Sequence, residues 1–337
     1  MGSAETEPSG LDVIGLGNAI VDVIAHADDG LIAELGLDKG IMTLVDEPRI
    51  DELYRRMGPA REMSGGSCAN SMAAVAALGG RAAYIGRVRD DQLGEVFAHD
   101  MRASGVVYRT RPSPSGPATA RCLIFVTPDA QRTMQTYLGA CVELGPEDVD
   151  EALVAQAAIT YLEGYLWDRP GAKAACRKAA DICHKSGGRL ALTLSDPFCV
   201  GRWRAEFRQL IRQEVDILFA NEAEITSLYE VDEFDAALAL AREEVETAAL
   251  TRGAMGSVVL RGSEMHAIDP VTPARLVDTT GAGDLYAAGF LRGLAAGLDL
   301  ESCGRLASAA AAQIIAQYGP RAEEPLAPLF ERARRAA

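Results

Sequence analysis

The sequence has few of the residues that several common chemistries require. Lysine occurs only four times among 337 residues, at Lys39, Lys173, Lys178 and Lys185. None of these completes a Gly-x-x-x-x-Gly-Lys pattern, which excludes a Walker-type phosphate-binding loop. Histidine is equally scarce and lacks metal-ligand spacing, with single residues at His26, His99, His184 and His266. We expect His184 to be a surface residue at a helix end.

Paired cysteines and long apolar runs are also missing. The seven cysteines are an odd number without a Cys-x-x-Cys pair, which favours reduced thiols in a cytoplasm over disulfides or zinc. No apolar run approaches the roughly 20 residues of a membrane span. Residues 1–10 are polar and acidic, without the parts of a signal peptide, and predict a disordered tail. The net charge of −15 argues against a nucleic-acid partner.

Apolar segments and helical patterns alternate along most of the chain, which predicts an α/β fold with a mostly parallel sheet and helices on both faces. Strands are predicted at 11–17, 82–86, 158–163, 190–194, 216–220, 248–251 and 257–260. Helices are predicted at 69–78, 91–103, 171–185, 222–229, 234–244, 281–296 and 301–318. Gly15-x-Gly17 is not a dinucleotide-binding motif, because Ile20 occupies the third glycine position.

The stretch Asp278-Thr279-Thr280-Gly281-Ala282-Gly283-Asp284 opens one of these helices. Gly281, Ala282 and Gly283 are predicted to form its first turn, where free N–H groups and the helix dipole suit a phosphate or a transition-state anion. Asp284, one turn in, is predicted to be ionised there and to act as the general base of a phosphoryl transfer. For an isolated Gly-Ala-Gly, a loop capped by aspartates is the alternative.

This stretch resembles the C-terminal signature of the ribokinase family of carbohydrate kinases, also called the PfkB family. The family's N-terminal signature is similar to Gly65-Gly66-Ser67-Cys68-Ala69-Asn70 in this chain. The resemblance extends from about residue 12 to about residue 320. It implies a ribokinase-like fold: one kinase domain at 11–337, with a small β-sheet lid over the substrate.

Extended segments at 20–27, 40–45, 118–127 and 132–138 do not alternate with helices, and a turn at 128–131 joins the last two. They resemble the lid of the family, which places lid segments at about 18–50 and 115–140. The inner face of the lid is expected to be apolar or aromatic. Its candidates are Phe125, Met134, Tyr137 and Leu138, with packing inside the lid as the alternative.

The resemblance also implies the acceptor site. An asparagine and an aspartate after the first strand bind sugar hydroxyls in the family, and Asn18 and Asp22 correspond to them here; turn residues are the alternative. Gly65 and Gly66 permit close approach of the backbone to a sugar, and Asn70 offers both a donor and an acceptor.

Arg132 lies at the predicted turn of the lid hairpin. In related nucleoside kinases an arginine reaches the transferred phosphate when the lid closes, and Arg132 is the candidate for this catalytic role. A solvated turn arginine is the alternative.

Two further motifs follow predicted strands, where open α/β sheets bind ligands. Asn221-Glu222-Ala223-Glu224 resembles the family's Asn-x-x-Glu motif, so Asn221 and Glu224 are expected near Mg²⁺, mostly through water. An acidic helix N-terminus is the alternative. The second motif, residues 251–257, resembles the nucleotide-binding turn, although alone it indicates only a hairpin. The expected ATP-binding residues are Asn221, Thr251, Gly253, Gly256, Asp278, Thr280, Gly281 and Gly283.

These features predict an ATP- and Mg²⁺-dependent kinase. The stretches 17–22 and 132–143 resemble bacterial proteins of the adenosine kinase branch, which implies the 5′-hydroxyl of adenosine as acceptor. Kinases for ribose, fructose, 2-keto-3-deoxygluconate, inosine or guanosine remain alternatives. A sugar- or nucleotide-sensing protein is the alternative from another class, and the intact Asp284 argues against it. The resemblance leaves open a monovalent cation such as K⁺, and a monomer or a homodimer.

Overall fold

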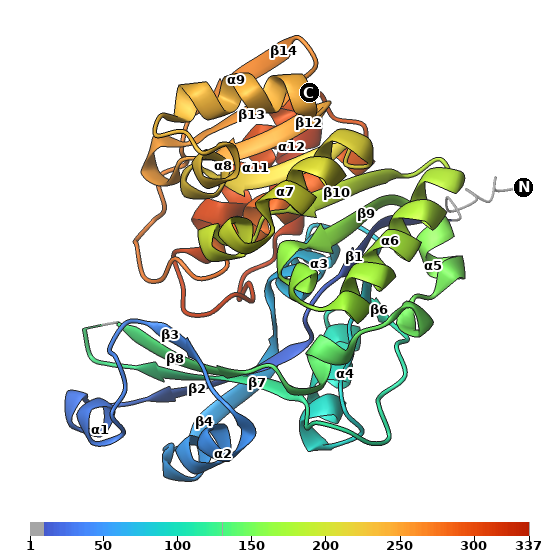
Figure 1. The fold of residues 1–337 in the computed structure, drawn as a ribbon. Coiled ribbons are helices and arrows are strands. Elements are labelled where there is room, and N and C mark those ends of the chain that lie inside the picture. Colours follow the sequence, from blue (N-terminus) through green and yellow to red (C-terminus); the bar gives the residue numbers. More distant parts are fainter. Residues whose placement is uncertain (1–9, 130, 337) are drawn as a thin grey trace, which may run out of the picture.

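The computed structural model describes residues 10–129 and 131–336. The tail predicted at residues 1–10 lies outside these residues except for Gly10. The chain forms a large sheet between layers of helices and a smaller sheet to one side of it (Figure 1). This is the predicted ribokinase-like α/β architecture.

The large sheet has nine strands in the order β14-β13-β12-β11-β10-β9-β1-β5-β6. Its strands are β1 (Leu11–Leu16), β5 (Ala82–Ile85), β6 (Val107–Tyr108), β9 (Ala157–Glu163), β10 (Arg189–Thr193), β11 (Ile217–Asn221), β12 (Thr247–Thr251), β13 (Ser257–Arg261) and β14 (Glu264–Ile268). Neighbouring strands are parallel except in the β12–β13 and β13–β14 pairs. Strands β6 and β14 were not predicted, because β6 has two residues and the side chains of β14 are mostly exposed.

Helices cover both faces of this sheet. One core contains side chains of α3 (Ser67–Ala77), α4 (Gln92–Ala103), α10 (Ala282–Ala295), α11 (Leu300–Ile314) and α12 (Ala327–Ala336). The other contains side chains of α5 (Glu151–Ala155), α6 (Pro170–Lys185), α7 (Pro197–Gln213), α8 (Glu222–Tyr229) and α9 (Phe234–Glu244). Successive strand residues alternate between the cores, as Val13 and Ile14 do in β1. Helix α7 was not predicted, and its non-helical backbone at Trp203 interrupts it.

The small sheet has five strands in the order β3-β8-β7-β2-β4. They are β2 (Ile20–His26), β3 (Met42–Leu44), β4 (Ala60–Gly65), β7 (Ala120–Val126) and β8 (Arg132–Tyr137). Helices α1 (Asp29–Glu34) and α2 (Glu47–Arg56) lie on its outer side (Figure 1). Four strands match the segments predicted for the lid. Strand β4 was not predicted, because its sequence lacks an apolar alternation.

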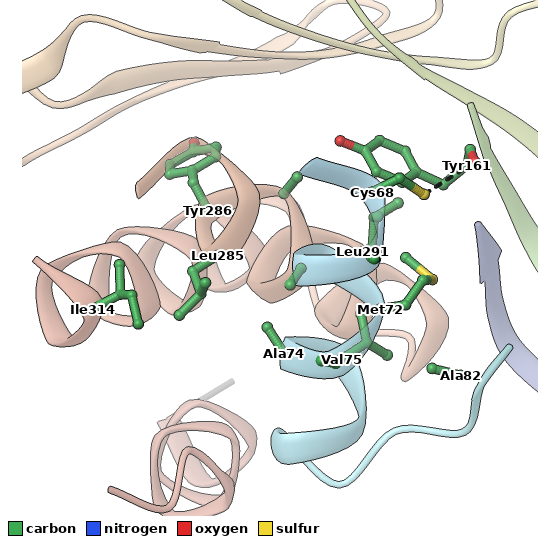
Figure 2. Close-up of a cluster of buried hydrophobic side chains, with 14 of the residues drawn as sticks. Cys68, Met72, Ala74, Val75, Ala82, Tyr161, Leu285, Tyr286, Leu291 and Ile314 are labelled. Carbon is green, nitrogen blue, oxygen red and sulfur yellow. Dashed lines mark hydrogen bonds between the residues drawn. The ribbon is translucent and has the colours of Figure 1, made fainter. Parts of the chain in front are cut away.

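Helices α3 and α10 lie against each other beside the sheet (Figure 2). Met72 and Val75 of α3 share one apolar core with Leu285 and Leu291 of α10. This packing brings the two signatures together, because each signature forms the start of one of these helices.

Several predictions about the surface and the thiols are confirmed. His184 lies in the last turn of α6, partly exposed, with Nε2 3.3 Å from Asp216. All seven cysteines are free and buried. None of the helices in the described part of the chain has both the length and the hydropathy for a bilayer crossing.

Candidate active site

The predicted base, Asp284, lies where α3 and α10 begin. Ser67 donates its hydroxyl to Asp284 Oδ1 at 2.6 Å, and the Asn70 amide donates to Oδ2 at 3.0 Å. Ser71 also donates its hydroxyl to the Asp284 carbonyl oxygen, at 3.1 Å. The first turn of α3 therefore orients a carboxylate that is more than 200 residues away in sequence.

The electrostatics of Asp284 differ from the prediction. The side chain is only partly accessible, and burial raises its pKa, although hydrogen bonds from Ser67 and Asn70 and the charge of Arg321 oppose the rise. The helix N-terminus was expected to favour the ionised form. Desolvation outweighs it, since the packing of α3 against α10 removes water from the carboxylate.

Asp22 of β2 lies beside this site and is 8% exposed. Burial raises the pKa of Asp22 to about 7, while Arg321 and Arg132 lower it and Asp284 raises it further. Gly65 touches the carboxylate, because a Cβ on Gly65 would lie 2.3 Å from Asp22 Oδ2. The structure thus brings Asp22 into contact with the Gly-Gly signature, as the predicted acceptor site requires.

We expect Gly65→Ala to weaken acceptor binding by displacing Asp22, since the added methyl group overlaps the carboxylate. The KM for the acceptor should rise at least about tenfold, equal to about 1.4 kcal/mol, with little change in the KM for ATP. Gly201→Ala in α7 is the matched control, because a Cβ there has no neighbour within 4 Å. An unchanged acceptor KM in the Gly65 variant would show that Asp22 does not touch the acceptor.

Asn70 offers a further polar contact at this place. It is 5% exposed, and its Oδ1 has no hydrogen-bond partner within the described residues. An unpaired buried acceptor is costly. A hydroxyl of a bound acceptor molecule is a suitable donor for it.

Asn18 contacts a residue that the sequence analysis missed. Its amide donates to Glu163 Oε1 at 3.1 Å, and the Cys68 N–H donates to Glu163 Oε2 at 3.0 Å. Gly17 makes room for this carboxylate, since a Cβ there would lie 2.4 Å from Oε2. Burial raises the pKa of Glu163 to about 7. One signal in the sequence could have identified Glu163, namely its position as the last residue of a predicted strand.

Asp278 stabilises the predicted anion-binding turn by accepting two hydrogen bonds from backbone N–H groups. Asp278 Oδ1 accepts a hydrogen bond from the Thr280 N–H, and Oδ2 accepts one from the Gly319 N–H, both at 3.0 Å. Gly281 has a left-handed backbone, with φ of 79°, and α10 starts at the next residue. One difference from the prediction is that the Ala282 N–H donates to the Thr279 carbonyl oxygen at 3.2 Å.

Arg132 is not a solvated turn residue, so that alternative is wrong. It is 9% exposed, forms an ion pair with Asp278, and donates to Thr280 Oγ1 at 3.2 Å. The small sheet therefore contacts the anion-binding turn through a guanidinium. The sequence could not show this contact, because Arg132 begins β8 whereas Asp278 lies far along the chain, in the segment between β14 and α10.

We expect Arg132→Ala to lower turnover by about 10- to 100-fold, because a charged hydrogen bond of roughly 1.5–3 kcal/mol is lost from the phosphoryl group. The acceptor KM should change less. Arg55→Ala in α2 is the control, since Arg55 is exposed on the outer side of the small sheet. If steady-state kinetics show an unchanged kcat, the role of Arg132 is limited to its ion pair with Asp278.

The face of the small sheet that carries Asp22 is apolar. Its residues form one cluster, comprising Ile20, Ile24, Cys122, Ile124, Val126 and Met134. Met42 and Leu44 of β3 pair in register with Met134 and Thr136, so they extend this face to the sheet edge, where they are 46% and 59% exposed. We call these residues the apolar face.

Two predicted inner-face residues point the other way. Phe125 is in the core under α2, and the Tyr137 hydroxyl donates to Glu47 at 3.1 Å. Leu138 follows β8 and lines a groove with Leu44. Only Met134 lies on the apolar face, because side chains alternate along a strand and sequence alone does not show which set faces the site.

Asn221 and Glu224 form a capping box at the start of α8. Asn221 Oδ1 accepts from the Glu224 N–H at 2.9 Å, and Glu224 Oε2 accepts from the Asn221 N–H at 3.0 Å. Burial raises the pKa of Glu224 to about 7, and Asp196 adds to the rise. No cluster of three or more His, Cys, Asp or Glu side chains that could hold a metal ion occurs in the described residues. Glu224 and Asp196 are two nearby carboxylates with few other protein ligands. Such a site suits Mg²⁺, which keeps several of its bound waters.

The predicted nucleotide-binding turn is a β12–β13 hairpin. Gly256 has φ of 81°, and a Cβ there would lie 2.1 Å from the Ile268 carbonyl oxygen, so glycine is required. Gly253, with φ of 56°, leaves open space. Residues 271–275, which lie in sequence between β14 and the anion-binding turn, line a groove of about 500 Å³ with α11.

Comparison with known proteins agrees with the fold described above. The family described as "pfkB family carbohydrate kinase" matches residues 42–327. A solved adenosine kinase from Sinorhizobium meliloti is 54% identical, with a TM-score of 0.88 over 97% of this chain and 100% of its own. A probable sugar kinase from Rhizobium etli CFN 42 is 50% identical, with a TM-score of 0.89 over 97% and 99%. The adenosine kinase of Saccharomyces cerevisiae is 27% identical over 334 residues, covering 91% of this chain and 96% of its own.

The fold and the site define an ATP-dependent phosphotransferase with an alcohol acceptor. The chain belongs to the PfkB family of carbohydrate kinases. Kinases of this family use ATP and Mg²⁺ and act on a nucleoside or a sugar, so the acceptor is the open question for this protein.

Proposed function

We propose that this kinase transfers the γ-phosphoryl group of ATP to the 5′-hydroxyl of a nucleoside, with adenosine as the acceptor and AMP as the product. The observation that carries this proposal is the apolar face next to Asp22. It continues from Cys122 to the sheet edge at Met42 and Leu44, beyond the polar residues that a sugar ring would occupy. A nucleobase would cover the accessible part of this face, which is the half-buried Ile20, Ile24 and Met134 and the exposed edge at Met42 and Leu44, whereas a free ribose or fructose would leave that part in water. The high identity to a solved adenosine kinase supports the proposal.

In this proposal, Asp22 and Asn70 hold the ribose. A carboxylate accepts hydrogen bonds from two adjacent hydroxyls, so Asp22 suits the 2′,3′-diol. The unpaired Oδ1 of Asn70 accepts a hydrogen bond from a further hydroxyl of the nucleoside, and Asn18 lies next to the turn at Gly66. With the diol held there, the 5′-hydroxyl is the free end and points to Asp284.

Asp284 then accepts the 5′-hydroxyl proton as the new O–P bond forms. The turn at Gly281 to Gly283 and the Arg132 guanidinium stabilise the charge on the transferred phosphoryl group. Asp278 and Thr280 keep that turn and Arg132 together. The residues that would lie along ATP are Asn221, Thr251, Gly253 and Gly256, and Mg²⁺ near Glu224 would neutralise its phosphates.

The decisive experiment is ADP release, coupled to an optical assay, with a panel of acceptors. Adenosine should give ADP and an equal amount of AMP, while ribose, fructose and 2-keto-3-deoxygluconate should give no ADP above background. Asp284→Asn, purified in the same way, controls for contaminating kinases. ADP release with a sugar but not with any nucleoside would refute the nucleoside proposal. Binding of nucleoside and ATP without ADP release would indicate a sensor.

A further inference from the structure

Arg321 lies between the two halves of the proposed site, although no motif marked it. Its guanidinium donates to the Ser64 carbonyl oxygen at 3.0 and 3.2 Å, to Ser64 Oγ at 2.7 Å, and to the Ala69 carbonyl oxygen at 3.1 Å. Asp100 of α4 accepts from both the N–H and the hydroxyl of Ser64 at 2.7 Å. Ser64 is therefore held from two sides and is fully buried.

These contacts surround the loop that shapes the acceptor site. Ser64 precedes Gly65, which touches the Asp22 carboxylate, and Ala69 precedes Asn70, which orients Asp284. Gly66 between them has φ of 92°, and a Cβ there would lie 2.3 Å from the Asn18 carbonyl oxygen. Arg321 thus ties both ends of a tight turn whose backbone position sets the place of Asp22.

The residues just before Arg321 contact the anion-binding turn. The Gly319 N–H donates to Asp278 Oδ2, and Pro320 packs against Gly281, where a Cβ would lie 3.0 Å from the proline ring. The segment 319–321 therefore contacts the anion-binding turn at one end and the acceptor loop at the other. It joins the same two parts of the site that the packing of α3 against α10 brings together.

The charge of Arg321 is also placed among carboxylates. The negative charges of Asp22, Asp100 and Asp284 interact with the Arg321 guanidinium, and Tyr84 lies near it. The other charged groups that face Asp22 and Asp284 are Arg132 and Glu163. Arg61 and Glu62 of β4 line a groove of about 430 Å³ together with Arg321. The positive charge of Arg321 thus interacts with two carboxylates of the site, Asp22 and Asp284.

We propose that Arg321 is a positioning residue for phosphoryl transfer: its guanidinium fixes the acceptor loop at a set distance from the anion-binding turn and supplies positive charge to the two acceptor-site carboxylates. This inference rests on the proposed function. The planar fork explains why arginine is used, because it reaches two carbonyls and a hydroxyl at once, which an ammonium group on a flexible stem does not.

The test compares Arg321→Lys and Arg321→Ala with Arg334→Ala, whose arginine is exposed on α12 and paired with Glu331. Each variant is assayed for kcat, for the KM of the acceptor and ATP, and for kcat/KM against pH. Arg321→Lys keeps the charge but loses the fork, so its acceptor KM should rise about tenfold while its acid limb stays at the wild-type pH. Arg321→Ala should also move the acid limb up by about one pH unit, because Asp22 and Asp284 ionise less readily without the cation.

Guanidinium chloride at millimolar concentration should restore part of the activity of Arg321→Ala but not that of Asp284→Asn. Unchanged acceptor KM and pH profile in both Arg321 variants would overturn the proposal. If Arg321→Ala does not fold, Arg321→Lys decides: a wild-type acceptor KM in that variant overturns it. If the wild type phosphorylates only a sugar, the kinetic constants of the Arg321 variants are compared with those of the wild type using that sugar as acceptor. A wrong acceptor and a wrong role for Arg321 therefore give different results.

Discussion

Replacing Asp284 by Asn should leave ATP binding nearly intact and reduce turnover at least about 100-fold, the low end for a positioned acid–base group. The amide keeps the shape of the side chain and can still bond to Ser67 and Asn70, but it cannot accept the proton of the attacking hydroxyl. Single-turnover kinetics with ATP binding measured separately would isolate the chemical step. Retention of more than about a tenth of wild-type turnover would rule out Asp284 as the base.

The raised pKa of Asp284 adds a pH signature to this prediction. A carboxyl whose pKa is raised by burial loses its ionised form as the pH falls, at a higher pH than an ordinary aspartate does. Turnover of the wild type should therefore decline on the acid side above the usual range of aspartate. The residual activity of Asp284→Asn should lack that limb. Asp181→Asn is the control, because Asp181 is exposed on α6 and pairs with Lys185.

The second large effect concerns the acceptor diol. If Asp22 holds the 2′- and 3′-hydroxyls, 2′-deoxy and 3′-deoxy nucleosides should be poorer acceptors than ribonucleosides by roughly 1,000-fold in kcat/KM, because a buried carboxylate is left unpaired. Burial makes the penalty large here, since Asp22 is 8% exposed and its pKa is already raised to about 7. The prediction is measured as the ratio of kcat/KM for adenosine and its deoxy analogues.

Asp22→Ala should remove most of this preference while the KM for ATP stays unchanged. The variant should use the ribonucleoside and the deoxynucleoside almost equally poorly. Asp51→Ala provides the comparison within the same sheet region, because Asp51 pairs with Arg121 and lies on α2, away from the apolar face. A variant at Asp22 that still discriminates as strongly as the wild type would place the diol elsewhere.

The local geometry around Asp284 could be predicted from the sequence. Gly281-Ala282-Gly283-Asp284 specifies a helix start with a carboxylate beside it, because free N–H groups and small side chains are local properties of a few consecutive residues. Gly65-Gly66 and Asn70 were identified for the same reason. The large sheet was also predictable, since buried parallel strands have continuous apolar sequences that alternate with helical patterns.

Only the tertiary structure decided which charges meet. Arg132 of the small sheet pairs with Asp278 in the segment before α10, and Glu163 at the end of β9 accepts a hydrogen bond from Asn18 between β1 and β2. Arg321, in the segment between α11 and α12, donates hydrogen bonds to Ser64, which is 257 residues earlier in the chain. Such contacts leave no local signal, because each residue alone is an ordinary polar side chain in a loop or at a strand end.

Burial was likewise decided by packing. From its sequence position, Asp284 was expected to be ionised by the helix terminus, yet its pKa rises, because α3 packs over the start of α10 and removes water. The direction of Phe125 away from the apolar face follows from strand register, which is set by partner strands. The sequence by itself determined which residues we propose for the chemistry, and the fold determined their ionisation and their partners, since both depend on distant parts of the chain that exclude water.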